Sequence, residues 1–144
     1  MRNKEIYASF RLAPQSSSER EAISLYQSGQ LQDAANICWQ LINVDPANFN
    51  AYHLLGLIAM RITEWEQAVQ LLLKSIEISP YQAGVHVNLG VALIKLGRIK
   101  DAVFCLQKAS EIDPSDVVIY HNLSNLYEVI DYKVWESHKS LENN

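Results

Sequence analysis

Two asparagines in this sequence are spaced so that they could hold a polypeptide backbone. Asn88 and Asn122 lie 34 residues apart, an interval that recurs elsewhere in the chain. A carboxamide carries a hydrogen-bond donor and an acceptor side by side, so it can pair with both polar groups of an extended peptide unit. Asparagines repeated at one spacing along a groove would therefore grip a backbone without reading its side chains. The alternative is that each amide bonds only to local backbone or to water.

Histidine and cysteine are the other residue types that could do chemistry, as metal ligands or nucleophiles. His53 and His121 share one register of the 34-residue interval, and His86 lies one step off it. Metal ligands converge within about 2 Å of an ion, whereas residues two intervals apart on stacked helices would be separated by about 20 Å. Cys38 and Cys105 lack the close spacing of zinc ligands, and we expect a core position for the first and a half-buried one for the second. We therefore predict no metal site.

Catalytic motifs are absent from the sequence. It contains no phosphate-binding loop, no Gly-x-Ser-x-Gly, no His-Glu-x-x-His and no dinucleotide fingerprint. A row of helices without inserted loops would also leave little room to enclose a substrate and exclude water. We therefore predict that the chain is not an enzyme, that it has no catalytic residues and that it binds no cofactor.

Composition narrows the classes of partner. The 144 residues are 49% hydrophobic and 19% charged, with a formal net charge of −4. Phosphate binding needs a concentrated basic face, so nucleic acid is not an expected partner. Residues 1–14 lack the apolar stretch of a secretory signal, and no run of 18 apolar residues could span a membrane. The expected location is cytoplasmic, with reduced thiols.

Proline marks an internal repeat. Pro46, Pro80 and Pro114 are 34 residues apart, twice over. Four further columns keep the same interval: Tyr52, His86 and Tyr120; Leu55, Leu89 and Leu123; Gly56 and Gly90, followed by Ser124; and Ala34, Ala68 and Ala102. Five columns that agree at one period indicate a repeat protein, in which stacked units bury a shared core.

Each period is predicted to form two antiparallel helices. In the best-defined unit, apolar residues at helical spacing favour helices over residues 52–62 and 65–78. Thr63 and Ser16 are each followed three residues later by a glutamate, which is the spacing of a capping box at a helix start. Each proline of the period lies just past a helix, where its missing N–H is tolerated.

Small residues are predicted where the chain turns or where helices cross. Gly29 and Gly97 occupy the break between the two helices of their units, where a chain reversal tolerates glycine well. Gly56 and Gly90, together with the alanine column, fall where the two helices of a hairpin would cross closely. A larger side chain there would push the helices apart.

The phrase Tyr52-His53-Leu54-Leu55-Gly56, followed by Ala68 and Pro80, resembles the tetratricopeptide repeat family. The resemblance covers roughly residues 15–130. It implies an all-α fold, a tetratricopeptide-type α-solenoid of antiparallel helix pairs. The expected division is an N-terminal extension at 1–14; units at 15–48, 49–82 and 83–116; the first helix of a fourth unit at 117–132; and a cap helix or tail at 133–144.

The resemblance also implies a concave groove lined by the first helix of each pair. The residues predicted to bind a peptide there are Asn88, Asn122, Asn125, Val87, Val91, Lys95, His53 and Leu57. The asparagine pair is similar to the solenoid of O-linked N-acetylglucosamine transferases, whose inner asparagines hold a polypeptide, although Leu54 would end the ladder here. A carboxylate clamp for chaperone tails is not predicted, because Glu19 and Ile23 stand at the corresponding places of the first unit and Val118 and Asn122 at those of the last.

We predict a non-catalytic interaction module that binds a protein or peptide segment in this groove. One alternative is the substrate-targeting N-terminal arm of a larger glycosyltransferase or methyltransferase. Another is a secretion-type chaperone built from three such repeats. A further alternative is a homo-oligomer that forms through the solenoid ends, where Trp39 and Trp135 stand.

Overall fold

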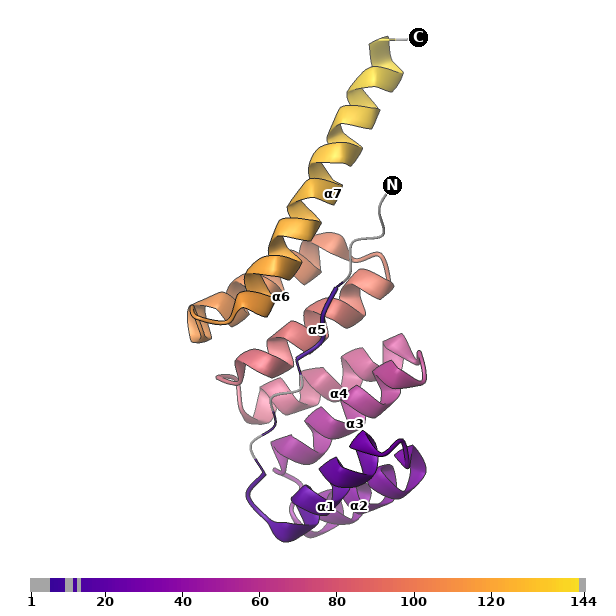
Figure 1. The fold of residues 1–144 in the computed structure, drawn as a ribbon, viewed down its shortest axis with the longest axis vertical. Coiled ribbons are helices and arrows are strands. Elements are labelled where there is room, and N and C mark those ends of the chain that lie inside the picture. Colours follow the sequence, from indigo (N-terminus) through magenta and orange to yellow (C-terminus); the bar gives the residue numbers. More distant parts are fainter. Residues whose placement is uncertain (1–5, 10–11, 13, 143–144) are drawn as a thin grey trace.

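The computed structural model describes residues 6–9, 12 and 14–142, except for the side chains of Trp135 and Glu142. Their elements are seven helices: α1 (Ser17–Gln27), α2 (Leu31–Val44), α3 (Phe49–Arg61), α4 (Trp65–Ile78), α5 (Ala83–Lys95), α6 (Ile99–Ile112) and α7 (Val117–Glu142). Helices α1 to α6 form three antiparallel hairpins that stack in chain order, and α7 packs on α6 (Figure 1). The prediction of an all-α solenoid of helix pairs is confirmed.

The helix starts have identifiable causes, and one predicted cause is wrong. The Ser16 hydroxyl accepts a hydrogen bond from the Glu19 N–H at 3.1 Å, as a capping residue should. The Asn48 side chain caps α3 in the same way, so that helix starts three residues earlier than the sequence suggested. Thr63 caps nothing, because α4 follows Glu64 and has no side-chain cap.

Thr63 instead closes the C-terminus of α3 in a left-handed conformation. Its φ is 63°, and Gly29 and Gly97, one period away on either side, have φ values of 83° and 75°. The Glu64 N–H donates to the Ala59 carbonyl and the Thr63 N–H to the Met60 carbonyl, which is the bonding of a Schellman motif. Gly29 and Gly97 therefore fit the motif without strain, while the β-branched Thr63 does not.

Replacing Thr63 by glycine should stabilise the protein. The left-handed conformation costs a non-glycine residue about 1–2 kcal/mol, and part of that gain is offset by the greater flexibility of glycine in the unfolded chain. We expect Thr63→Gly to raise the free energy of unfolding by about 0.5–1 kcal/mol, measured from urea titrations. Thr63→Ala keeps the left-handed penalty and serves as the control. A Thr63→Gly variant no more stable than Thr63→Ala would contradict this account.

Two glycines let the helices of a hairpin approach each other. A Cβ on Gly56 would lie 2.7 Å from Leu72 Cδ2, and one on Gly90 would lie 3.1 Å from Leu106 Cγ. Both leucines are completely buried, so neither has free space to move into. The predicted small-residue column is confirmed at these helix crossings.

These distances predict unequal costs for the same substitution. Gly56→Ala forces an overlap that typically costs about 1–3 kcal/mol, against about 1 kcal/mol of gain in helix propensity. Gly90→Ala should be close to neutral, whereas Gly90→Trp should unfold or severely loosen the domain. Thermal unfolding followed by circular dichroism checks the order. Equal melting temperatures for Gly56→Ala and Gly90→Ala would refute the crossing geometry.

The last helix departs from the expected division. A boundary was expected after residue 132, but α7 continues without a break over 26 residues. Neither glycine nor proline occurs between Val117 and Glu142, so nothing in the backbone ends the helix at residue 132. Its C-terminal half extends beyond the stacked hairpins (Figure 1). Within the described part of the chain, no helix is both long enough and apolar enough to cross a bilayer.

Candidate functional site

The N-terminal residues 6–9 lie along the inner face of the solenoid, across α5 and α7 (Figure 1). We call residues 6–9 the bound segment and Asn88 and Asn122 the asparagine ladder. Asn122 Oδ1 accepts from the Tyr7 N–H at 3.0 Å, and its Nδ2 donates to the Tyr7 carbonyl at 2.8 Å. Asn88 Oδ1 accepts from the Ser9 N–H at 2.7 Å, and its Nδ2 donates to the Ser9 carbonyl at 2.8 Å.

This pairing uses one edge of an extended chain. In an extended backbone the N–H and C=O groups of residues i and i+2 point to the same side, and the ladder bonds both groups of Tyr7 and both groups of Ser9. The bound segment therefore advances two residues for each repeat. Because Tyr7 lies on α7 and Ser9 on α5, the segment runs against the order of the repeats. Only main-chain atoms are recognised in these four bonds.

His53 fixes the orientation of the Asn88 amide. Its Nε2 lies 2.8 Å from Asn88 Nδ2, and that amide nitrogen also donates to Ser9. Because an NH₂ group can only donate, the imidazole must be neutral with its lone pair on Nε2. Burial supports this state by lowering the pKa of His53 to about 4. The amide of Asn88 then has its oxygen and both N–H bonds satisfied.

The low pKa of His53 predicts acid sensitivity. Unfolded His53 takes up a proton near pH 6.5, whereas the folded protein does so only near pH 4. Between these values the unfolded state binds more protons, so stability falls as pH falls, by about 3 kcal/mol in all. His53→Gln keeps an acceptor near Nε2 and cannot titrate. Urea titrations at pH 7 and pH 4.5 should show a larger loss for the wild type, and equal losses would rule out the neutral, buried imidazole.

Each asparagine with the residue that it bonds forms one rung of the ladder. The rung of Asn122 and Tyr7 has aromatic and amide neighbours. The Tyr7 ring lies 5.0 Å from the His121 imidazole, with the planes inclined at 53°. His121 Nε2 in turn lies 3.1 Å from Asn125 Nδ2. Asn125, one of the predicted binding residues, therefore positions the imidazole that Tyr7 covers.

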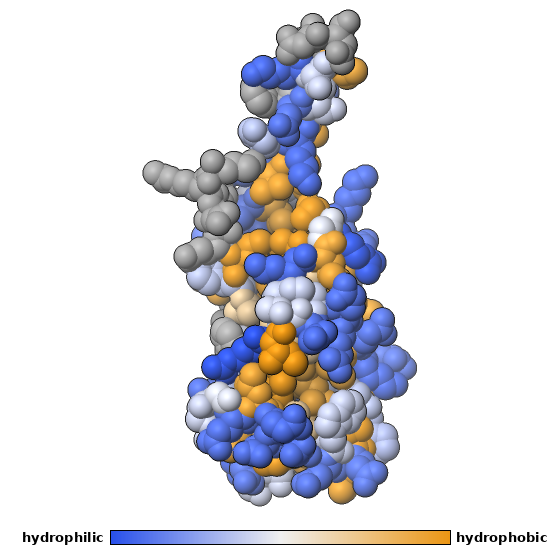
Figure 2. All heavy atoms as spheres, turned by 90° about the vertical axis from the view of Figure 1, so that its right-hand side faces the viewer, coloured by the Kyte–Doolittle hydropathy of each residue, from blue (hydrophilic) through white to orange (hydrophobic). Residues whose placement is uncertain are grey.

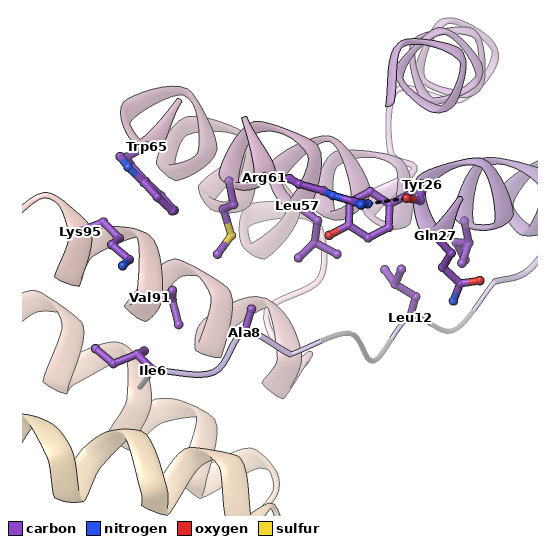
Figure 3. Close-up of a pocket in the computed structure, with 12 residues that line it drawn as sticks. Ile6, Ala8, Leu12, Tyr26, Gln27, Leu57, Arg61, Trp65, Val91 and Lys95 are labelled. Atoms are coloured by element: carbon purple, nitrogen blue, oxygen red, sulfur yellow. Dashed lines mark hydrogen bonds between the residues drawn. The ribbon is translucent and has the colours of Figure 1, made fainter. Parts of the chain in front are cut away.

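An apolar hollow of about 530 Å³ lies between the bound segment and the C-terminal ends of α1, α3 and α5 (Figure 3). Twelve residues line it: Ile6, Ala8, Leu12, Ile23, Tyr26, Gln27, Leu57, Met60, Arg61, Trp65, Val91 and Lys95. Figure 2 shows apolar side chains in a band along one side of the molecule, with hydrophilic ones around them. The hollow could accept one or two large apolar side chains.

Two cations lie among the lining residues. Arg61 lies 5.2 Å from the centre of the Tyr26 ring and donates to the Tyr26 carbonyl at 2.6 Å. Lys95 Nζ lies 5.8 Å from the centre of the Trp65 ring. Aromatic faces thus hold both cations at the hollow, and none of the described residues that line it carries a carboxylate.

The structure brings together most of the predicted binding residues. Leu57, Val91 and Lys95 line the hollow, whereas Val87 is completely buried and lines none of the described hollows. That these residues bind a partner stays a prediction. Sequence reasoning did not find the bound segment or Tyr26 and Trp65. The periodicity gave no signal for the segment, since residues 6–9 precede the first repeat.

The two cysteines are poorly suited to chemistry. Cys38 is completely buried, and Cys105, expected to be half-buried, is also buried. Burial raises the pKa of the Cys38 thiol to about 12 and that of Cys105 to about 11, so both are protonated at neutral pH and weakly nucleophilic. Among the described residues, no three His, Cys, Asp or Glu side chains lie close enough together to hold a metal ion.

Comparison with known proteins places these features in a family context. Residues 64–126 match the tetratricopeptide repeat family model. A mutant O-GlcNAc transferase from Thermobaculum terrenum superposes with a TM-score of 0.73 at 26% identity, over 76% of this chain and 21% of that one. This chain thus spans about a fifth of that enzyme. No curated protein sequence matches the present chain significantly.

Two further solved structures share the fold. The second tetratricopeptide domain of human RPAP3, in complex with an HSP70 peptide, has a TM-score of 0.72 at 17% identity, over 77% of this chain and 92% of that one. MamA from Desulfovibrio magneticus RS-1 has a TM-score of 0.71 at 21% identity, over 85% and 70% of the two chains. Both are similar to this chain in architecture.

Proposed function

We propose, from the premise that this chain belongs to the tetratricopeptide repeat family, that it is a non-catalytic interaction module. Its ligand would be an extended polypeptide segment in the concave groove. The ladder would hold the ligand's main chain, and the apolar hollow would receive its side chains. Protein-binding repeats of this kind include the RPAP3 domain that is bound to an HSP70 peptide.

One observation carries the proposal. Asn88 and Asn122 already hold an extended backbone, through four hydrogen bonds of 2.7–3.0 Å to Tyr7 and Ser9. Bonds to main-chain groups do not depend on the side chains of the bound residues. A polypeptide from another molecule presents the same N–H and C=O groups at the same two-residue interval.

Recognition of a terminal carboxylate, as in a carboxylate clamp, is not favoured. Glu19, in the first repeat, accepts from Asn48 Nδ2 at 3.0 Å and from Asn50 Nδ2 at 3.1 Å. A carboxylate held in this place would repel a second one, since like charges brought together out of water are costly. The groove is therefore suited to an internal stretch of polypeptide.

A second candidate function has one observation in its favour. The similarity to an O-GlcNAc transferase covers most of this chain and only a fifth of the enzyme. The chain would then act as the substrate-targeting arm of a larger glycosyltransferase, and the groove would hold the polypeptide to be modified. The binding chemistry is the same in both functions, and only the presence of a catalytic domain distinguishes them.

Removing the ladder should abolish most of the binding. Peptides selected from a random twelve-residue display library on the full-length chain should bind the double variant Asn88→Ala with Asn122→Ala at least about tenfold more weakly. The reason is that each lost hydrogen bond costs about 0.5–1.5 kcal/mol, and 1.4 kcal/mol corresponds to tenfold. Fluorescence anisotropy measures the dissociation constants.

The matched control replaces two asparagines on the outer helix α2. Asn36→Ala with Asn43→Ala changes exposed residues that face away from the groove, and it should leave affinity unchanged. Circular dichroism verifies that both double variants are folded. Selected peptides that bind the folded ladder variant as tightly as the wild type would show that the groove does not bind through these asparagines.

A further inference from the structure

We infer that residues 6–9 are an internal ligand that closes the groove of the free chain, and that the partner is a polypeptide segment of related pattern that displaces them. The pattern has apolar residues at the places of Ile6 and Ala8, a small residue at the place of Ser9 and a variable one at the place of Tyr7. This inference rests on the proposed function, and it adds which segments the groove accepts and what they compete with.

The bound segment and a partner polypeptide cannot occupy the ladder at the same time. Asn88 and Asn122 are completely buried beneath the bound segment. The oxygen of each amide accepts from the segment, and the nitrogen of each donates to it. A second backbone therefore finds no ladder group to bond until the segment leaves. The apparent affinity for a partner is the intrinsic affinity of the open groove multiplied by the fraction of molecules in which the segment is released.

Burial of the segment defines the pattern. Ser9 is 5% exposed, so a larger side chain at its place would displace the backbone from Asn88. Ile6 and Ala8 line the apolar hollow, and Figure 3 shows both beside Val91. Tyr7 is 45% exposed, so its place tolerates many side chains. The alternation of Ile6, Tyr7 and Ala8 follows from the extended backbone, whose successive side chains point to opposite sides, whereas the requirement at Ser9 follows from its burial.

The hollow explains how a partner can displace the bound segment from the ladder, although that segment is tethered to the same chain. A segment on the same chain competes at an effective concentration in the millimolar range, so a partner needs contacts that the segment does not make. The small Ala8 leaves much of the 530 Å³ hollow unfilled. A segment with a larger apolar residue at this place would bury more apolar surface against Leu57 and Val91, which favours its binding over that of the tethered segment.

The test opens the groove of the full-length chain with a single substitution. Ser9→Pro removes the N–H that donates to Asn88, and Ser9→Ala retains it as the matched control. The probe is a fluorescein-labelled peptide with the sequence of residues 4–12 carrying Ala8→Leu. Anisotropy should show that Ser9→Pro binds this probe at least about tenfold more tightly than the wild type and Ser9→Ala do. Tyr7→Pro, which removes the donor of the other rung, should behave like Ser9→Pro.

The probe also tests the pattern. The same peptide with Ser9→Trp should lose at least about tenfold in affinity for the opened chain, and the unsubstituted peptide with alanine at position 8 should bind more weakly than the probe. Equal affinities for these peptides would overturn the assigned pattern.

The remaining outcomes separate this inference from the proposed function. Probe binding that is equally tight in the wild type, Ser9→Ala and both proline variants, yet lost in the ladder variant, would overturn closure by the segment while supporting groove binding. No probe binding to any folded variant would overturn the inference, while library peptides that depend on the ladder would still support the groove. A wild-type dimer that binds the probe only on dilution would overturn an internal ligand, because the segment would then come from a second copy.

Discussion

A carboxamide buried away from water needs partners for its oxygen and for its N–H bonds, and this requirement organises the concave face. Asn88 meets it with the N–H and C=O of Ser9 and the imidazole of His53. Leaving one buried polar group unsatisfied costs about 1–3 kcal/mol. Among the described residues, every buried side-chain nitrogen and oxygen has a partner. The ladder amides therefore need hydrogen-bond partners, which the bound segment supplies here and which water or a partner would have to supply once the segment leaves.

The helical repeat places the ladder where it can meet that requirement. Asn88 and Gly90 are two residues apart on α5, and at 100° for each residue they point about 200° away from each other. Gly90 faces Leu106 on α6, so Asn88 faces the groove. The 34-residue period repeats this arrangement at Asn122 on α7. One face of each inner helix thus fixes the hairpin while the opposite face offers an amide to a ligand.

The periodic part of this architecture could be predicted from the sequence, and the contacts that break the period could not. The stacked hairpins, the glycine crossings and the inward position of Asn88 all follow from columns that recur every 34 residues. Thr63 was misassigned as a cap because its local spacing to a glutamate was read in isolation. Its column holds Gly29 and Gly97, whose left-handed conformation it shares. The bound segment, by contrast, is bonded to residues far away in the sequence. Ser9 and Asn88 are 79 positions apart, and Tyr7 and Asn122 are 115 positions apart. Residues 6–9 match no column of the repeat. Main-chain recognition leaves almost no trace in the sequence of the bound residues, since any backbone supplies the same groups. Only the small size of Ala8 and Ser9 reflects the close approach, and two small residues alone do not distinguish a segment that binds a groove from one that does not.

The asparagine ladder binds the main chain of a ligand, and the apolar hollow selects among its side chains. The ladder ends at α5 because Leu54, which is buried, stands in its column on α3 and cannot bond a backbone. The apolar hollow lies beside the bound segment and is lined by α1, α3 and α5, with Arg61 and Lys95 held over aromatic rings. A ligand in the place of residues 6–9 therefore has its main chain bonded by the ladder, while alternate side chains, at the places of Ile6 and Ala8, enter the hollow. Two rungs supply only part of the binding free energy, so discrimination among ligands must come from the side chains that enter the hollow.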